Sequence, residues 1–223
     1  MLDLRSRLVI PGALTLLALT AGTVAGASPT AIWHMDETSG SVMRDSSGHG
    51  HNGTLKNIKL GVPGVGGTKG YGFNGTSSVI VVPDAPDLDA GTADMVVTVH
   101  VAFSETPDDD YDLIRKGLAT TKGGDWKIEI VNVSGKSLAR CYLKGSGGSW
   151  QKTTGPDLAD GKYHTITCEK HATTVSMSID GTVWKKTKSL GTMGNDAVLS
   201  IGAKAEGGDW FEGSMDEVSV VNG

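Results

Sequence analysis

The stretch "KYHTITCEKHATTVSMSIDGTVWKKT" (residues 162–187) alternates between apolar and polar side chains along most of its length. A repeat of two residues is typical of a β-strand that buries one face. The dipeptide Asp180-Gly181 separates "VSMSI" from "VWKKT", and a two-residue Asp-Gly loop between alternating segments predicts a tight β-hairpin. This stretch therefore predicts antiparallel strands that are joined by short turns.

The same alternation recurs over much of the chain from residue 30 onward. Further strands are predicted at "TAIWHM" (30–35), "DMVVTVHVAF" (94–103), "WKIEIVN" (126–132), "SLARCYL" (137–143) and "GSMDEVSVVNG" (213–223). Parity and neighbouring residues place Trp33, Trp126 and Trp210 in the predicted core. Many short strands without helical patterns predict an all-β sandwich or barrel. No linker or repeat divides the chain, so we expect one domain over residues 28–223.

The first 27 residues have the pattern of a secretory signal peptide. Arg5 and Arg7 precede the apolar run "LVIPGALTLLALTAG" (8–22), and small residues follow up to Ala27. This run is too short, and too interrupted by Pro11 and Gly12, for a comfortable membrane span. We therefore expect a secreted protein that is cleaved after Ala27 and has no membrane contact afterwards. An uncleaved anchor is the alternative.

The charge of the chain argues against two classes of partner. The net charge is −5, and it becomes −6 when residues 1–27, with two Arg and one Asp, are removed. Nucleic acids and anionic membrane surfaces bind basic patches, and no cluster of Lys and Arg is present in the sequence. We therefore expect neither nucleic acid nor an anionic membrane surface as a partner.

The two cysteines predict one disulfide. In an exported protein an even number of cysteines is by default paired. Cys141 shares a strand face with Leu143, and Cys168 shares one with Ile166. Both sulfurs are therefore predicted on the inward faces of neighbouring strands, where they can join. Two separate buried thiols are the alternative.

Four segments, in this order, resemble the signature blocks of a known family. They are "IWHMDETSGSVMRDSSGHGHNGTL" (32–55), "GVPGVGGTKGYGFNGTSSVIVVP" (61–83), "DGKYHTITCEKHATTVSMSIDGTVW" (160–184) and "IGAKAEGGDWFEGSMDEVSVVNG" (201–223). Together they are similar to the laminin-G-like, or concanavalin A-like lectin/glucanase, jelly-roll domains of the secreted bacterial type. The resemblance implies two antiparallel sheets of six or seven strands each, of which one is concave. It also implies that the first and last strands pair, with a calcium ion near them in many members.

The tripeptide Met-Asp-Glu occurs near both ends of the folded region, at 35–37 and at 215–217. If the terminal strands pair, Asp36 and Asp216 meet on the core-side face, and two close carboxylates need a proton or a cation between them. Calcium is the suitable extracellular cation because it takes six to eight oxygen ligands. Asn74 and Gly75 are weaker candidates for such ligands. The alternative is that backbone N–H groups satisfy both carboxylates.

No catalytic residue is predicted. The glucanases that the chain resembles carry a Glu-x-Asp-x-x-Glu strand, whose carboxylates flank the scissile bond. No segment of this sequence has that pattern, and none has the Gly-x-Ser-x-Gly motif of serine hydrolases. A glycoside hydrolase or polysaccharide lyase of the same fold stays open as an alternative.

Several residues instead suggest a binding surface. Strand parity points Arg140 and Tyr142 away from the core, and Tyr163 does the same on another strand. Trp150, in the Gly-rich "GSGGSWQK", is predicted to be an exposed aromatic residue. Aromatic rings beside polar groups suit a sugar. The sequence thus predicts a monomeric, non-catalytic, calcium-stabilised module for a glycan or an extracellular polymer. An adhesion or structural domain with protein partners is the alternative.

Overall fold

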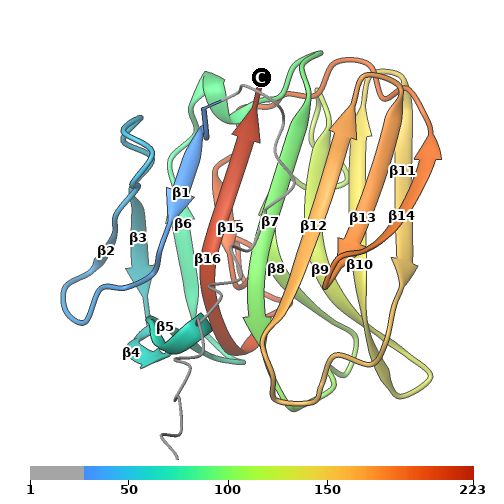
Figure 1. Cartoon of the computed structure of the whole chain (residues 1–223). Coiled ribbons are helices and arrows are strands. Elements are labelled where there is room, and N and C mark those ends of the chain that lie inside the picture. The colour runs from blue at the N-terminus through green and yellow to red at the C-terminus, as the bar shows by residue number, and fades with distance from the viewer. Residues whose placement is uncertain (1–27) are drawn as a thin grey trace, which may run out of the picture.

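The computed structural model describes residues 28–223, so the predicted signal peptide lies outside the described residues. These residues form a sandwich of two antiparallel sheets, as the sequence predicts (Figure 1). Each sheet holds eight strands, against the six or seven that the resemblance implied. None of the helices in residues 28–223 has the length and apolar character needed to cross a membrane.

Sheet A is ordered β14-β13-β12-β7-β16-β5-β4, with β1 on the same edge of β16 as β5. Its strands are β1 (Ala31–Trp33), β4 (Lys59–Pro63), β5 (Lys69–Asn74), β7 (Met95–Ala102), β12 (His164–His171), β13 (Thr174–Ile179), β14 (Thr182–Thr187) and β16 (Glu212–Asn222). Sheet B is ordered β11-β10-β9-β8-β15-β6-β3-β2. Its strands are β2 (Val42–Met43), β3 (Gly53–Lys56), β6 (Val79–Val82), β8 (Asp110–Lys116), β9 (Asp125–Val133), β10 (Lys136–Gly145), β11 (Gly148–Thr154) and β15 (Leu199–Ile201). Two short 3₁₀ helices, η1 (Val65–Gly67) and η2 (Pro86–Leu88), lie in connections.

The predicted hairpin is present between β13 and β14. Ile179 pairs with Thr182, which leaves Asp180 and Gly181 as the two loop residues. Both have a positive φ, of 50° and 81°, as the hairpin turn with the twist of the flanking strands requires. The hairpin that the local sequence predicted is therefore confirmed.

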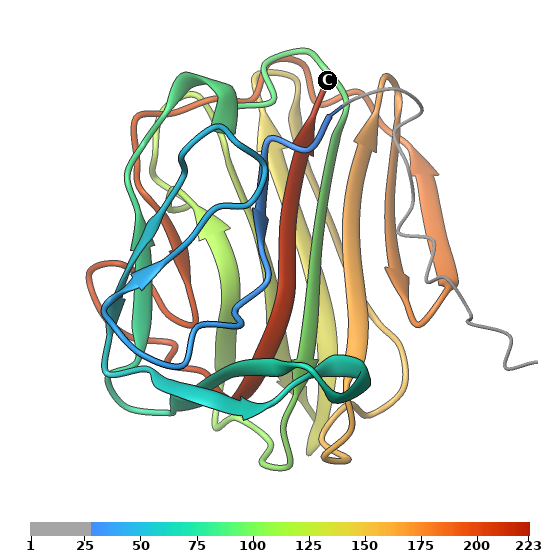
Figure 2. The same ribbon diagram turned by 60° about the vertical axis from the view of Figure 1, so that its left-hand side comes forward.

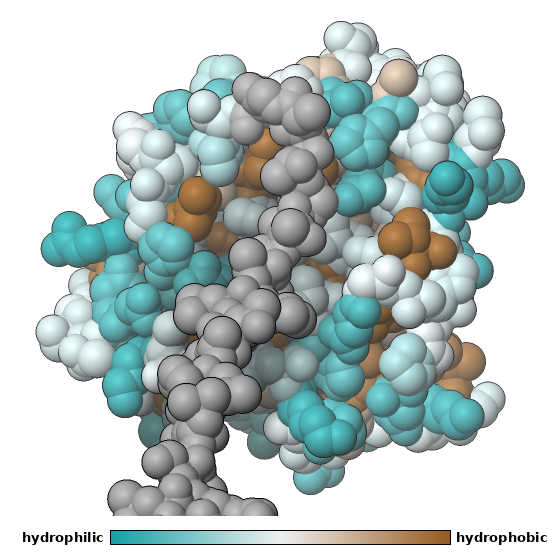
Figure 3. All heavy atoms as spheres, viewed as in Figure 1, coloured by the Kyte–Doolittle hydropathy of each residue, from teal (hydrophilic) through white to brown (hydrophobic). Residues whose placement is uncertain are grey.

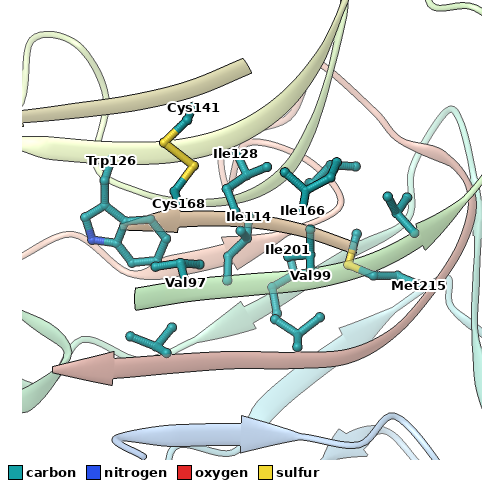
Figure 4. Packing of buried hydrophobic residues seen from close by; sticks show 14 of the residues in the cluster. Val97, Val99, Ile114, Trp126, Ile128, Cys141, Ile166, Cys168, Ile201 and Met215 are labelled. Carbon is teal, nitrogen blue, oxygen red and sulfur yellow. A yellow bond between two sulfur atoms is a disulfide. The ribbon is translucent and has the colours of Figure 1, made fainter. Parts of the chain in front are cut away.

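The core lies between the sheets and is crossed by the disulfide between Cys141 and Cys168 (Figure 4). The two Cα atoms are 5.9 Å apart. The predicted pairing is therefore confirmed, but the two cysteines do not lie on neighbouring strands of one sheet, as was predicted. Cys141 lies on β10 of sheet B and Cys168 on β12 of sheet A, so the bond joins facing sheets. Parity defines the buried face of a strand, but not the sheet to which the strand belongs.

The first and last strands pair, as the resemblance implied. Ala31 pairs with Val220 and Trp33 with Val218, and β1 and β16 lie side by side in both views (Figure 2). All four side chains are in the core. The two ends of the folded region are therefore held together in the middle of sheet A.

A β-bulge in β16 changes the predicted orientation of Asp216. The register with β7 shifts between Asp216 and Ser219, and Glu217 has a φ of 47°. Met215 and Val218, three residues apart, consequently both face the core, whereas Asp216 lies on the opposite face, where the loop of residues 64–69 buries it. The prediction that Asp36 and Asp216 lie on the core-side face was wrong, because Asp36 is exposed and a bulge resets the alternation of side chains after Asp216.

In the part of the outer face of sheet A that Figure 3 shows in colour, hydrophobic side chains form separate small patches. Among the described residues, the exposed large apolar side chains are Val42, Val133 and Val183. Single exposed apolar residues of this kind are ordinary on protein surfaces.

Candidate functional site

Two rows of polar side chains cross the outer face of sheet B. The strand register defines one row of Arg115, Lys127, Tyr142 and Gln151, and another of Asp112, Glu129, Arg140 and Thr153. We call these eight residues the sheet B face. Alternating residues of the same strands, such as Ile128, Cys141 and Trp150, face the core.

A second bulge builds this face. The register between β8 and β9 shifts between Asp112 and Ile114, so Leu113 and Ile114 are both in the core. Asp112 and Arg115, three residues apart, therefore share the outer face, and Arg115 Nη1 lies 2.5 Å from Asp112 Oδ2. In a regular strand these two side chains would point to opposite faces.

The carboxylates of this face lie beneath its cations. Glu129 forms salt bridges with Lys127 and with Arg140, whose Nη1 lies 3.0 Å from Glu129 Oε1. Asp112 and Glu129 are fully buried, whereas the side chains of Lys127 and Arg140 are 19% and 28% exposed. The groups offered to a ligand are therefore mainly the hydrogen-bond donors of Lys127 and Arg140, together with the partly exposed residue Tyr142, whereas Arg115 is buried.

The loop of residues 203–209 borders the sheet B face. Lys204 forms a salt bridge with Asp209, and the Asp209 carbonyl accepts a hydrogen bond from the Asp112 N–H at 2.9 Å. A hollow of about 140 Å³ lies beneath this loop and beside Arg115. Trp210, predicted in the core, is instead partly exposed at the end of the loop. Trp33 and Trp126 are buried as predicted.

Asp110 has the clearest electrostatic perturbation in this region. Burial, followed by the nearby charges of Asp209 and Glu129, raises the pKa of Asp110 to about 7. Burial also raises the pKa of Asp112, although Arg115 and Lys127 oppose this.

We expect Asp110→Asn to make stability less dependent on pH. A carboxyl group with a raised pKa binds its proton more tightly in the folded chain than in the unfolded chain, so the free energy of unfolding falls as pH rises from 3.8 to about 7. The variant cannot ionise, so its melting temperature should exceed that of the wild type at about pH 8 but not at about pH 4. Equal effects at both pH values in thermal melts would contradict this assignment.

The four predicted binding residues do not form one surface. Arg140 and Tyr142 belong to the sheet B face. Tyr163 precedes β12 of sheet A, and its hydroxyl donates to the Pro63 carbonyl at 3.0 Å. Trp150 is only 8% exposed and packs in the core. Its predicted exposure was wrong, because the neighbouring glycines form the turn of the β10–β11 hairpin and leave Trp150 inside a strand, opposite Leu143.

Asp36 and Asp216 approach the same short loop, residues 64–69. Asp216 Oδ2 accepts from the Val65 N–H and the Thr68 hydroxyl, both at 2.9 Å, and its Oδ1 accepts from the Glu217 N–H. Asp36 Oδ1 accepts from the Lys69 N–H at 3.2 Å. Burial raises the pKa of Asp216 despite these hydrogen bonds. The loop thus supplies hydrogen-bond donors to both carboxylates.

The other two predicted calcium ligands lie further along the sheet. The Asn74 Oδ1 accepts from the N–H groups of Thr76, Ser77 and Ser78, which closes a turn at Gly75. Asn74 pairs with Glu212, four residues from Asp216, a separation of about 13 Å along a strand. No group of three or more His, Cys, Asp or Glu within residues 28–223 could hold a metal ion.

The groups that face Asp216 do not fit a calcium ion. They are N–H and O–H donors, whereas calcium requires a shell of oxygen ligands. Calcium therefore stays a prediction that this arrangement of donors does not support. It can be tested by chelation.

Of the sheet B face, the sequence indicated only Arg140 and Tyr142, and Asp112 and Trp210 illustrate why the positions of other residues in this region were missed. Asp112 lies in "PDDDYD" (107–112), a run of acidic residues that reads as a solvated turn. Only the register, which places Asp112 opposite Glu129, shows that the two carboxylates share a face. Trp210 adjoins Phe211, which is in the core, and nothing in the sequence marks the change from exposed to buried.

Comparisons with known proteins agree with this architecture. The pattern of the concanavalin A-like lectin/glucanases superfamily matches residues 74–223, more than half of the chain. No curated protein matches the sequence. Among solved structures, domain 4 of an extracellular arabinanase from Geobacillus stearothermophilus, in complex with arabinotriose, is 18% identical with a TM-score of 0.62. The match covers 88% of this chain and 93% of that one.

Toxin domains are also similar in structure. The binding domain of Paraclostridial Mosquitocidal Protein 1 is 15% identical with a TM-score of 0.67, over 88% of this chain and 48% of that one. The ligand-binding domain of botulinum neurotoxin serotype D, in complex with N-acetylneuraminic acid, is 14% identical with a TM-score of 0.65, over 87% and 47%. This chain thus spans about half the length of these toxin domains, and at such identities the likeness shows the fold alone. Together with the sequence pattern over residues 74–223, the two-sheet sandwich establishes that the chain belongs to the concanavalin A-like lectin/glucanases superfamily.

Proposed function

We propose that this protein is a secreted, monomeric, non-catalytic module that binds carbohydrate through the sheet B face. Arg115 of the first row is buried, so the accessible part of that row, Lys127, Tyr142 and Gln151, carries this proposal. It places one aromatic ring between polar side chains on adjacent strands. A sugar ring stacks its apolar C–H face on an aromatic side chain, while its hydroxyl groups bind polar neighbours.

The polar groups of this face are fixed before a ligand arrives. Arg140 Nε donates to the Thr153 hydroxyl at 2.9 Å, and Nη1 bonds to Glu129. Lys127 is likewise held by Glu129. Binding would therefore cost little side-chain entropy, because these long side chains are already ordered.

The carboxylates of the face fit a binding role better than hydrolysis. Asp112 and Glu129 lie opposite each other on β8 and β9, so the face does contain a pair of neighbouring carboxyl groups. Hydrolysis requires the two carboxyl groups to flank the scissile bond. Both groups here are fully buried and paired with Arg115, Lys127 and Arg140. Their geometry supports a role in orienting the cations above them.

The comparisons support sugars as the class of ligand. Two of the similar structures were solved with a saccharide, arabinotriose in one and N-acetylneuraminic acid in the other. The disulfide is consistent with a secreted protein, because such bonds persist in oxidising compartments.

The proposal is tested by retention on immobilised polysaccharides, with arabinan, xylan, a β-glucan and a sialylated glycan as the panel. We expect the wild type to be retained on at least one of them. Tyr142→Ala should weaken that binding by about 10-fold to 100-fold, as for a central aromatic contact. Tyr142→Phe should keep the binding, because the ring remains.

The matched control is Val183→Ala, an exposed residue of sheet A that is 56% accessible, which should bind as the wild type does. Equal retention of Tyr142→Ala and the wild type would contradict the proposal. Retention on none of the polymers would favour the alternative of a protein-binding adhesion domain. Release of soluble sugar from a retained polymer would show that the chain is an enzyme.

A further inference from the structure

A second cleft lies at the edge of the sandwich, on the side of β11 opposite to the sheet B face. Its volume is about 410 Å³, within the usual range for small-molecule sites. We call it the edge cleft. The end of β11 and the β13–β14 hairpin form its walls, with Thr154, Pro156, Ile179, Asp180, Thr182 and Trp184 in the lining.

Trp184 is in an unusual position for a residue on an edge strand. Every other residue of β14 is exposed, whereas Trp184 is partly buried and packs against the core. It pairs with Met177, which pairs with Cys168 of the disulfide. One part of the indole is thus supported by the core, and another part borders the edge cleft. A supported, partly exposed indole is a rigid platform with a low entropic cost of binding.

We propose that the edge cleft binds one ring of an uncharged sugar, stacked on Trp184. This site goes beyond the proposed function of the sheet B face and does not depend on it. The hydroxyls of Thr154 and Thr182 can donate to or accept from sugar hydroxyls, and Ile179 adds apolar surface. An aromatic platform with a few convergent polar groups is the usual composition of a small-ligand site.

Asp180 orients and selects the ligand. Its Oδ1 accepts from the Thr165 N–H at 2.8 Å, and its Oδ2 lies 2.7 Å from Nδ1 of His164. The side chain is 46% exposed, and an ionised carboxylate has about four lone-pair sites, so it can also accept from sugar hydroxyls. Within the described residues that line the cleft, Asp180 is the one ionisable side chain. Its negative charge disfavours uronic acids and other anionic sugars.

The test follows the indole N–H signal of Trp184 in ¹⁵N-labelled protein by NMR. Trp184→Leu identifies that signal by its loss and keeps an apolar side chain against the core. The wild type is titrated with glucose, galactose, mannose, xylose and arabinose, and separately with glucuronate and galacturonate. We expect a saturable shift with at least one neutral sugar, in the millimolar range of weak binding. Both uronates should shift the signal less.

A variant of the other surface separates the two sites. Tyr142→Ala should leave the sugar-induced shift of Trp184 unchanged, even though it is expected to lose retention on polysaccharides. Three results would contradict sugar binding in the edge cleft. They are no shift of the Trp184 signal with any neutral sugar, an equal shift with a uronate, and loss of the shift in Tyr142→Ala. A failure of the proposed function would instead be seen as unchanged polysaccharide retention by Tyr142→Ala.

Discussion

Replacing both cysteines by alanine is expected to lower the free energy of unfolding by about 3–4 kcal/mol. Cys141 and Cys168 are 27 residues apart in the sequence, and closing a loop of this length removes that much conformational freedom from the unfolded chain in the chain-entropy model. For a domain of this size the melting temperature should fall by about 10 °C.

The position of the bond adds to this effect. It joins β10 of sheet B to β12 of sheet A, so it links the two layers of the sandwich directly. Alanine suits the test because both sites are buried in the core, where a serine hydroxyl would need a partner. Urea denaturation of the double variant gives the change in free energy.

Reduction of the wild type is the control, because it opens the same bond without changing the side chains. The reduced wild type and Cys141→Ala/Cys168→Ala should show similar decreases in the free energy of unfolding. A loss below about 1 kcal/mol in both cases would contradict an important role for the bond in the stability of the sandwich.

Asp216→Ala is expected to lower the free energy of unfolding by about 2–3 kcal/mol. The carboxylate is fully buried, and it accepts hydrogen bonds from Val65, Thr68 and Glu217. Its removal takes the acceptor from three donors that lie in half-buried or exposed residues, and the loss of three hydrogen bonds at about 1 kcal/mol each gives this cost. Asp36→Ala is the matched control, since Asp36 is exposed and accepts one hydrogen bond from the same loop. The free energy of unfolding of Asp36→Ala should be lower than that of the wild type by less than about 1 kcal/mol.

Chelation then distinguishes hydrogen bonding from the calcium ion that the sequence predicted. If hydrogen bonds satisfy Asp216, the melting temperature of the wild type should be the same with a chelator and with added calcium. If calcium lies between Asp36 and Asp216, the chelator should lower the melting temperature of the wild type, and Asp216→Ala should abolish that shift. A chelator-sensitive wild type would show that our interpretation of the donors around Asp216 is wrong.

Local features of the sequence were reliable guides to the fold. The alternation around Cys168 and the Asp180-Gly181 loop depend on neighbouring residues only, and the structure confirms both strands and the hairpin. The parity of Cys141 and Cys168 correctly placed both sulfurs in the core. These predictions succeeded because strand alternation and turn geometry are set within a few residues.

Features that depend on register could not be predicted in the same way. The bulges at Glu217 and beside Asp112 reverse the orientation of the residues that follow, and the turn glycines beside Trp150 place it in a strand. The sheet to which each cysteine strand belongs depends on the order of all the strands. The sheet B face was therefore found only in part, through Arg140 and Tyr142.

The most direct test of carbohydrate binding by the sheet B face is to map the bound saccharide by NMR. A short oligosaccharide of the retained polymer is titrated into ¹⁵N-labelled protein, and the shifts of the backbone amide signals are assigned to strands. We predict that the largest shifts fall on β9, β10 and β11, around Lys127, Tyr142 and Gln151. Shifts confined to β7, β12 and β16 of sheet A would contradict the assignment of carbohydrate binding to the sheet B face.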